Sequence, residues 1–281
     1  MRFVRYTAGG PPEWGVNCDG SIRRLDGLPG GPPELADLAN ESYLATIDRQ
    51  LDRNELPTID RERVHPLAPV PVPGKIICVG LNYHDHAAEQ DEAVPEAPLL
   101  FGKAPTAVTN PESPIVHPGG DEQVDYEVEL GVVIGAQTRH VKAEAARNYL
   151  AGYTIINDVS GRTAQGDDEQ FLRGKSYDTF APMGPALVAD RTLDPGALDV
   201  RLRVNGQTKQ SSNTEDLIFS VEELIEYISK HMTLRAGDVI STGTPSGVGI
   251  FRDPPDLLEP GDTVEAEIEG IGVLRNHVVA E

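Results

Sequence analysis

The chain has 281 residues, with 45 Asp and Glu against 24 Lys and Arg, and it therefore carries a formal net charge of −21. A charge of this sign and size repels nucleic acids and acidic membrane surfaces, so the composition argues against both as partners. No apolar run reaches the roughly 20 residues that span a bilayer, and the N-terminus has no apolar signal-peptide core. With only two cysteines, Cys18 and Cys78, we expect a cytoplasmic protein without a disulfide framework.

The basic residues are 6 Lys and 18 Arg. Few lysines among many acids suit a protein that stays soluble in concentrated salt, where screening removes the self-repulsion. We put forward a halophilic source as a hypothesis, beside that of an ordinary acidic protein. The hypothesis predicts that the protein unfolds as salt is removed, which circular dichroism at falling NaCl concentration would measure; full stability in low-salt buffer would contradict it.

The N-terminal part carries weak patterns, which predict short strands over residues 1–7 and 14–25 and a helix over 43–51. Residues 66–75, PLAPVPVPGK, are proline-rich and extended, which is typical of a linker. We place the domain boundary there. The prediction is a small N-terminal domain over residues 1–70 and a catalytic domain over residues 71–281.

Beyond the linker, apolar runs separated by turn residues predict strands. Residues 82–90 indicate a helix or a mobile lid, and residues 220–232 a helix that starts with a capping box of Ser220 and Glu223. Because helices are few and do not alternate with strands, we predict a β-rich α+β fold and not a doubly wound dinucleotide fold. The predicted strands lie within 75–81, 99–108, 124–135, 153–160, 197–206, 238–245 and 263–279.

The stretch VDYEVEL, residues 124–130, alternates apolar residues with acids, so Asp125, Glu127 and Glu129 are expected on one face of a strand. Aligned carboxylates repel one another, and one would be protonated unless a cation lies between them. Asp158 ends a nearby apolar strand and is a third acid for such a site. Oxygen ligands favour Mg²⁺ first, then Mn²⁺ or Ca²⁺. The alternative is a solvated strand face.

His86 and Glu89 lie three residues apart, which makes them neighbours on one helical turn. A carboxylate beside an imidazole orients the ring and raises its basicity, as a water-activating base requires. The alternative is a surface His–Glu pair, and His84 is the competing histidine. The loop STGTPSGVG, residues 241–249, offers backbone N–H groups and a hydroxyl that suit a carboxylate, unless it is only a structural turn.

Seven motifs together resemble those of the fumarylacetoacetate hydrolase family. They follow the family's order from residue 75 to residue 277, whereas residues 1–70 match only loosely. The motifs are G-L-N-Y-x-x-H-x-x-E (80–89), F-x-K (101–103), D-Y-E-V-E-L (125–130), G-Y-T-x-x-N-D-V-S (152–160), R-G-K-S-x-D-T-F-x-P-x-G-P (173–185), V-N-G (204–206) and T-L-x-x-G-D-V-I-x-T-G-T-P-x-G-V-G (233–249).

The resemblance implies a mixed β-roll catalytic domain in a homodimer. It implies that His86 is the general base, that Glu89 orients it, and that Lys175 acts beside a bound Mg²⁺ or Mn²⁺, which Ca²⁺ can replace in a crystal. The residues that bind this metal are then Glu127, Glu129 and Asp158.

The resemblance also implies which residues contact the substrate. They are Arg162, Gln165 and Thr244, to which we add Tyr83 and Lys103 from the first two motifs. Asp125 is not a ligand in the family and is expected to support the loop. Thr163 stands where the family often has an aspartate, and this departure affects substrate identity but not the metal site.

The predicted function is hydrolysis of a C–C bond in an acylpyruvate-like β-diketo acid, a small 2-oxo acid substrate, through a metal-stabilised enolate. His86 with Glu89 would take a proton from the water that attacks the C4 carbonyl. The alternatives are a decarboxylase or isomerase of diacids in aromatic catabolism, and a dehydratase or hydrolase of 2-keto-3-deoxy sugar acids. A further alternative, from a different functional class, is a protein that binds the metal but is not a catalyst. The loss of a predicted ligand or of the predicted base would favour this alternative, but all of them are present.

Overall fold

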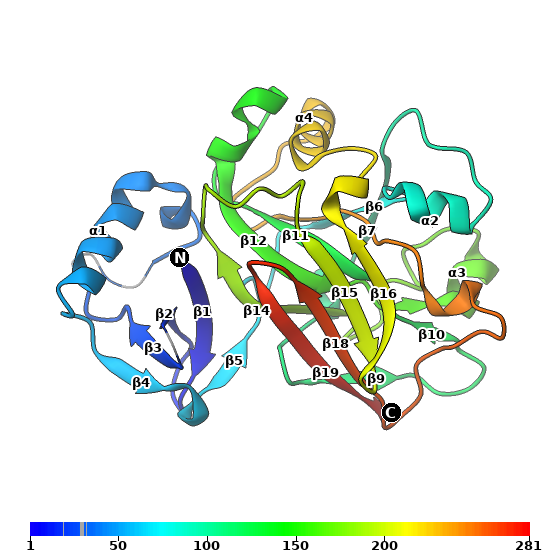
Figure 1. The fold of residues 1–281 in the computed structure, drawn as a ribbon, viewed down its shortest axis with the longest axis horizontal. Helices are drawn as coiled ribbons and strands as arrows, with labels where there is room; N and C mark the ends of the chain where they lie inside the picture. Colours follow the sequence, from blue (N-terminus) through cyan, green and yellow to red (C-terminus); the bar gives the residue numbers. More distant parts are fainter. Residues whose placement is uncertain (19, 29–30, 32) are drawn as a thin grey trace.

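The computed structural model describes residues 1–18, 20–28, 31 and 33–281. A small group of N-terminal strands with helix α1 lies beside a larger β-rich part, and the two meet where β1 runs next to β14 (Figure 1). The helices are α1 (Glu41–Asp52), α2 (His84–Glu89), α3 (Arg162–Asp168) and α4 (Val221–His231), with short 3-10 turns η1 (Asp37–Ala39), η2 (Arg61–Arg63), η3 (Pro105–Ala107), η4 (Ala143–Tyr149), η5 (Thr214–Asp216) and η6 (Gly249–Phe251).

Strands make up most of the regular structure, which confirms the predicted β-rich α+β fold. In chain order they are β1 (Arg2–Thr7), β2 (Glu13–Cys18), β3 (Ser21–Arg24), β4 (Thr58–Asp60), β5 (His65–Leu67), β6 (Ile76–Gly80), β7 (Leu99–Lys103), β8 (Val108–Thr109), β9 (Pro114–His117), β10 (Val124–Asp125), β11 (Val128–Ile134), β12 (Leu150–Asn157), β13 (Ser160–Gly161), β14 (Ala181–Val188), β15 (Asp199–Val204), β16 (Gln207–Asn213), β17 (Val239–Ser241), β18 (Thr263–Ile268) and β19 (Gly272–Ala280).

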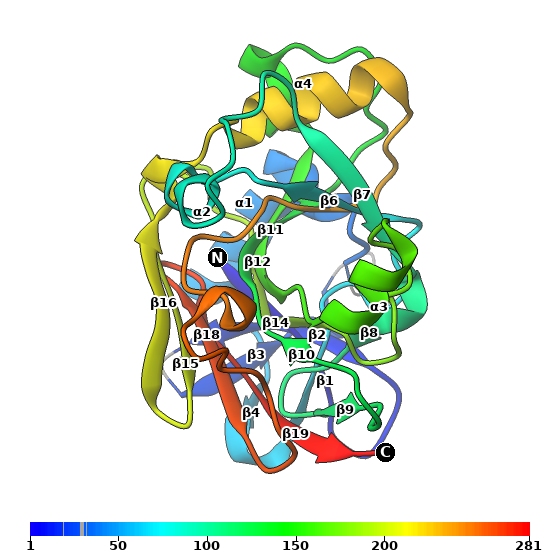
Figure 2. The same cartoon turned by 90° about the vertical axis from the view of Figure 1, so that its right-hand side faces the viewer.

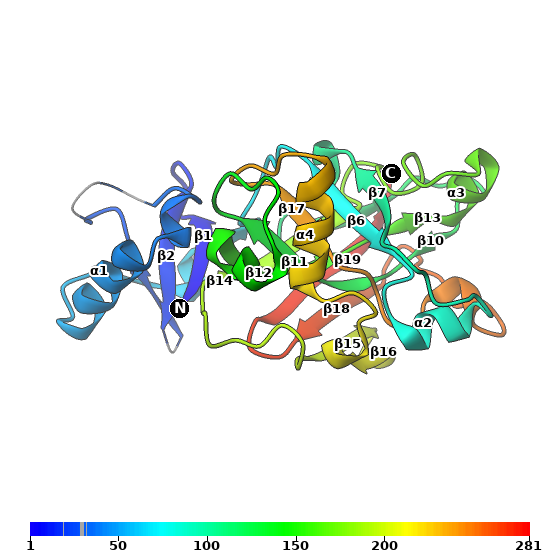
Figure 3. The same ribbon diagram turned by 90° about the horizontal axis from the view of Figure 1, so that it is seen from above.

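The main sheet has the strand order β4-β3-β2-β1-β14-β12-β11-β17-β6-β7, so it continues from the N-terminal strands into the larger part. A second sheet, in the order β16-β15-β18-β19-β9, packs across it, and α4 covers a further side (Figures 2 and 3). The core between them combines side chains of both sheets and α4, such as Leu130, Leu202 and Ile225. Strand β11 is therefore buried along its whole length.

The N-terminal part shares a second apolar core with the main sheet, in which Phe3 and Ile47 pack with Val133 and Leu187. The division of the chain at residues 70 and 71 stays a prediction. No helix among the residues that the structure describes is long and apolar enough to cross a membrane.

Helix α4 begins with the predicted capping box, in which the Ser220 backbone N–H donates to Glu223 at 2.8 Å. The strand predicted over 124–135 is wrong in one respect, because it is interrupted after Asp125. Strand β10 pairs with β13, and β11 starts only at Val128, opposite Asn157. The backbone between them leaves the sheet because its hydrogen bonds go elsewhere: the Glu127 N–H donates to the Asn157 side chain at 3.0 Å.

Candidate active site

The loop that joins β10 to β11, the start of β11 itself and the residue that follows β12 each contribute one of three carboxylates that lie together. One oxygen from each of Glu127, Glu129 and Asp158 lies within 4.8 Å of the others, and all three residues are buried. Two contacts fix this geometry: the Asp158 N–H donates to the Glu127 carbonyl at 2.8 Å, and the Gly243 N–H donates to Glu129 at 2.9 Å. Glu129 is thereby tied to the TGTP loop.

Three cations surround the carboxylates: Lys103 and Lys175 are buried, and Arg162 is mostly buried. Lys175 donates to Glu127 at 2.7 Å and to Asp158 at 2.9 Å, and Lys103 donates to the other oxygen of Asp158 at 2.5 Å. Arg162 donates to Glu127 at 2.7 Å. Burial by itself lowers the pKa of Lys175, but Asp158 and Glu127 outweigh it, so the pKa is raised and the ammonium group stays charged.

The two glutamates have opposite protonation behaviour. Burial raises the pKa of Glu127, but Lys175 and Arg162 reverse the shift and hold the pKa at about 2. Burial, Asp158 and Glu127 together raise the pKa of Glu129 to about 8. Glu129 is therefore the carboxyl that takes a proton at neutral pH when no cation balances the cluster.

The donor set fits a divalent cation. With Asp125 included, four buried carboxylates face the three cations Lys103, Lys175 and Arg162, which leaves one negative charge in excess when all are ionised. Three converging carboxylate oxygens are the ligands that Mg²⁺, Mn²⁺ or Ca²⁺ prefer. Such an ion would be held by Glu127, Glu129 and Asp158, as predicted, and would replace the proton on Glu129.

This replacement has a measurable consequence. At about pH 6.5 we expect Mn²⁺ binding to release close to one proton per ion, because a carboxyl must ionise to bind a metal. The release should vanish near pH 9, above the pKa of about 8 of Glu129. Titration calorimetry in two buffers of different ionisation enthalpy gives the proton count. A Glu129→Gln variant is the control, and a wild-type count of zero near pH 6.5 would contradict the assignment.

Asp125 has a different role from the two glutamates, since it is not part of the three-carboxylate group. Its carboxylate accepts from Arg162 at 2.8 and 3.0 Å, and from the backbone N–H groups of Gly249 and Ile250 at 2.7 and 3.0 Å. It therefore ties the 3-10 turn η6 to Arg162, which agrees with the expectation that it supports a loop.

Helix α2 places His86, the predicted general base, beside the cavity that Glu127 and Glu129 line. His86 is buried, with 7% of the residue exposed, and its Nδ1 lies 3.0 Å from Glu89, whereas His84 is exposed. Glu89 in turn accepts from the Gly247 N–H at 2.8 Å, so α2 is attached to the loop that follows β17. Of the two histidines, His86 is the one that faces the cavity.

A cavity of about 130 Å³ lies between α2, the carboxylates and α3. Seven predicted site residues line it: His86, Glu127, Glu129, Arg162, Gln165, Lys175 and Thr244. Glu89 and Asp158 lie behind this lining as partners of His86 and Lys175. The Thr244 hydroxyl donates to the Val128 carbonyl at 3.0 Å.

Two residues predicted to bind substrate, Tyr83 and Lys103, do not line the cavity. Lys103 is buried on Asp158 and the Val159 carbonyl, and Tyr83 is fully buried with a hydroxyl that has no hydrogen-bond partner in the described structure. The sequence prediction also missed residues that do line it. Among these, Gln90 follows the H-x-x-E motif directly and was identifiable from helical spacing. Phe101 opens the F-x-K motif, whereas Phe171 and Phe251 carry no local signal.

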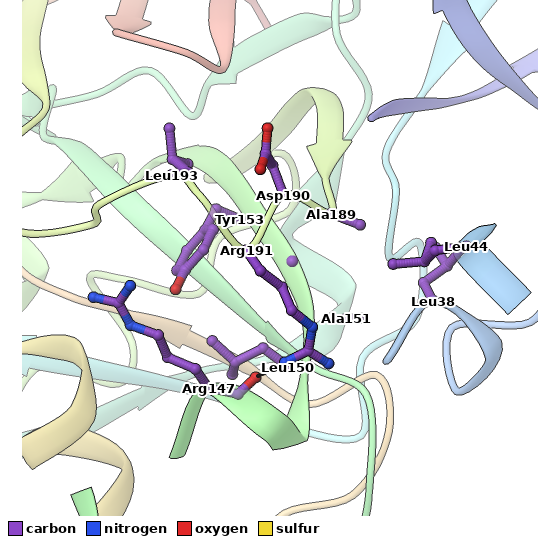
Figure 4. Close-up of a pocket in the computed structure, with 11 residues that line it drawn as sticks. Leu38, Leu44, Arg147, Leu150, Ala151, Tyr153, Ala189, Asp190, Arg191 and Leu193 are labelled. Carbon is purple, nitrogen blue, oxygen red and sulfur yellow. Dashed lines mark hydrogen bonds between the residues drawn. The ribbon is translucent and has the colours of Figure 1, made fainter. Parts of the chain in front are cut away.

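A second cavity lies far from this chemistry, between the N-terminal part, strand β12 and the segment that follows β14 (Figure 4). Leu38 and Leu44 lie on one side of it and Leu150 and Ala151 on the other. Its volume of about 30 Å³ is room for little more than one water molecule. This cavity is a packing gap and not a substrate site.

The fold and the site define a metal-dependent enzyme of the fumarylacetoacetate hydrolase family. The family model described as fumarylacetoacetate (FAA) hydrolase C-terminal matches residues 75–279, and the chain belongs to this family. It is 47% identical over 242 residues to bovine (Bos taurus) mitochondrial oxaloacetate tautomerase FAHD2A, covering 85% of this chain and 77% of the relative. The corresponding protein of Xenopus laevis, oxaloacetate tautomerase fahd2, is 45% identical and covers 99% of this chain and 90% of its own length.

Solved structures give the same result. The fumarylacetoacetate hydrolase of psychrophilic Exiguobacterium antarcticum superimposes with a TM-score of 0.87 at 37% identity, over 100% of both chains. Maleylpyruvate hydrolase from Sphingobium sp. SYK-6, in complex with manganese(II) and pyruvate, has a TM-score of 0.83 at 31% identity, over 100% of this chain and 99% of that one.

Proposed function

We propose that this chain is a divalent-metal-dependent tautomerase that interconverts the enol and keto forms of oxaloacetate or a similarly small 2-oxo diacid. The observation that carries the proposal is that His86, Lys175, Glu127 and Glu129 face one cavity of about 130 Å³, with Asp158, the third carboxylate of the cluster, directly behind them. Relatives at 45–47% identity are named oxaloacetate tautomerases, which supports the choice of substrate.

The charge of the site suits an anionic substrate. A divalent cation in the cluster turns the excess of one negative charge into an excess of one positive charge, and it supplies Lewis-acid stabilisation to the negative charge of an enolate. The Thr244 hydroxyl of the TGTP loop donates to the Val128 carbonyl and the Gly243 N–H donates to Glu129, so the contact of this loop with a substrate carboxylate stays a prediction. Lys175 adds a permanent positive charge at the cavity wall.

The proton transfer falls to His86. Its Nε2 would take a proton from C3 of the keto acid, as the C3–H electron pair forms the C2–C3 double bond and the carbonyl pair moves onto oxygen. Returning the proton to that oxygen gives the enol, and the reverse steps give the keto form. Glu89 keeps Nδ1 protonated and stabilises the imidazolium between the two transfers.

Hydrolysis of an acylpyruvate, the function expected from the sequence, is the second candidate. The complete His86–Glu89 pair and the maleylpyruvate hydrolase neighbour favour it. It would use the same base to activate water. The homodimer, Mg²⁺ as the resident ion and the cytoplasmic location stay predictions.

A substrate comparison tests the proposal. With Mg²⁺ or Mn²⁺, we expect ketonisation of enol-oxaloacetate to exceed the metal-only rate and to be faster than cleavage of acetylpyruvate or decarboxylation of oxaloacetate. His86→Ala should slow ketonisation by about 10²- to 10⁴-fold, the usual contribution of a general base, without changing metal affinity. His84→Ala, two residues away on the same helix and exposed, should not slow it. Faster cleavage than ketonisation would favour the second candidate, and full activity of His86→Ala would contradict both.

A further inference from the structure

Both ring nitrogens of His86 are engaged. Nδ1 lies 3.0 Å from a Glu89 carboxylate oxygen, and Nε2 lies 2.8 Å from the side-chain amide nitrogen of Gln90. A neutral imidazole has one donor and one acceptor nitrogen, and an ionised carboxylate can only accept. Nδ1 therefore carries the proton, and Nε2 accepts a hydrogen bond from Gln90. The nitrogen that has to take the substrate proton is already occupied.

The position of Gln90 is set by helix α2. Its backbone N–H donates to the His86 carbonyl at 3.3 Å, and the i, i+4 spacing places its side chain over the imidazole. Gln90 also lines the substrate cavity. Its amide is thus within reach of both the base and a bound substrate, and it has to leave Nε2 before any proton transfer can occur.

The other charged and amide side chains of the cavity lining form hydrogen bonds and ion pairs with protein groups. Arg162 is bonded to Asp125 and Glu127, Gln165 accepts from Arg162 at 3.1 Å, and Lys175 is bonded to Glu127 and Asp158. The lining away from the carboxylates is apolar and consists of Val79, Leu81, Leu99, Phe101, Phe171 and Phe251. Among these lining residues, Gln90 is the polar side chain best placed to meet an oxygen at the far end of a substrate.

We propose that Gln90 is a specificity-determining residue that recognises an oxygen on C4 of the substrate and, in doing so, releases Nε2 of His86. The proposal rests on the proposed function, and it takes the 2-oxo carboxylate end of the substrate to be bound on the side of Glu127 and Glu129, which leaves C4 toward Gln90. A 2-oxo acid with a C4 carboxylate offers the Gln90 amide a better acceptor than the neutral imidazole nitrogen, because a hydrogen bond to an ionised acceptor is about twice as strong as one between neutral groups. A 2-oxo acid without that oxygen leaves the base occupied.

The test compares two substrates of the same protein. Oxaloacetate has a C4 carboxylate and 2-oxobutyrate has only a methyl group there, and exchange of the C3 protons with D₂O reports proton transfer for both. Wild-type protein with Mg²⁺ should prefer oxaloacetate, and Gln90→Leu, of similar size but without an amide, should reduce this preference in kcat/KM at least about tenfold, the equivalent of one hydrogen bond. In Gln90→Leu, the absolute rate of proton exchange from 2-oxobutyrate should rise, because Nε2 of His86 no longer accepts a hydrogen bond from Gln90.

A matched variant and a second readout separate this role from a structural one. Gln165→Leu removes the same group from the same cavity but without a contact to His86, so it should slow both substrates and leave their ratio unchanged. ¹⁵N NMR of His86 should show a single Nδ1–H tautomer in the wild type and a mixture in Gln90→Leu. An unchanged substrate ratio in Gln90→Leu, or a wild-type Nε2–H tautomer, would overturn the proposal. The NMR result stands even if the protein does not tautomerise oxaloacetate, so the two proposals fail separately.

Discussion

Replacing Glu129 by glutamine is expected to abolish metal-dependent activity while stabilising the metal-free protein at alkaline pH. Loss of one of three carboxylates from the cluster should weaken Mn²⁺ binding and reduce ketonisation at least about a thousandfold, since Lewis-acid stabilisation amounts to several kcal/mol. Calorimetry of Mn²⁺ binding and steady-state kinetics measure the two effects. The glutamine oxygen can still accept from the Gly243 N–H, so the local fold should persist.

The stabilising effect of Glu129→Gln follows from the pKa of Glu129. The folded protein keeps a proton on Glu129 up to about pH 8, whereas the unfolded chain releases it near the ordinary value of 4.5. The free energy of unfolding of the wild type therefore falls as the pH rises between these values, and the Glu129→Gln substitution removes that slope. Urea denaturation of the metal-free proteins at about pH 5 and pH 9 should show the variant gaining a few kcal/mol relative to the wild type at the higher pH.

Glu265→Gln, a strand glutamate outside the site, is the matched control and should change neither activity nor the pH slope. Activity within tenfold of the wild type in Glu129→Gln would contradict the assignment of Glu129 as a ligand. A lower stability of this variant at about pH 9 would contradict the electrostatic account of the cluster.

Replacing Asp125 by alanine is expected to cost about 3 to 5 kcal/mol of stability, the penalty for removing one partner of a buried ion pair. The change deprives Arg162 of a carboxylate and leaves the Gly249 and Ile250 N–H groups without their acceptor. Denaturant unfolding with metal present gives the loss, and the melting temperature should fall by about 10 °C for a chain of this size. Asp125→Asn keeps an acceptor oxygen and should lose less.

The control for Asp125 is Asp48→Ala, an exposed position in helix α1 that should alter stability by less than about 0.5 kcal/mol. If Asp125→Ala lowers the free energy of unfolding by less than about 1 kcal/mol, the Asp125 carboxylate does not stabilise the contact between Arg162 and the turn η6. Retained Mn²⁺ affinity in Asp125→Asn is expected, because Asp125 is not in the three-carboxylate group. Loss of that affinity without loss of stability would instead make Asp125 part of the metal site.

Glu127, Glu129 and Asp125 show what a local sequence pattern can predict about the site and what it cannot. The two-residue period of a strand and the repulsion between carboxylates sufficed to predict that Glu127 and Glu129 converge with Asp158, and the structure brings them within 4.8 Å. The same period wrongly placed all three acids of VDYEVEL on one continuous strand: Asp125 ends β10, Glu127 lies in the loop between the strands, and Glu129 lies in β11. The hydrogen-bond partners of Asp125, Arg162 and Gly249, lie 37 and 124 residues away in the chain. The seven residues of VDYEVEL therefore contain no information about these contacts.

Motif membership proved a weaker guide to side-chain direction. Tyr83 and Lys103 belong to the same motifs as His86 and Phe101, yet both are buried away from the cavity. Whether a side chain faces a cavity or the protein interior depends on what packs against its element. Lys103 faces inward because its ammonium group pairs with the buried carboxylate of Asp158. This pair can form only when β7 and the end of β12 come together in the folded protein.

The sequence by itself indicated the β-rich fold through its apolar periodicity, the His86–Glu89 pair through helical spacing, and the family through the resemblance of seven motifs, with which the set of Glu127, Glu129 and Asp158 agrees. Only the tertiary structure decided which histidine nitrogen faces the substrate, that Gln90 occupies it, and that Asp125 serves Arg162 and η6 and not the cation. The physical reason is that burial and hydrogen-bond partners are properties of packed neighbours, and in this chain those neighbours come from distant segments.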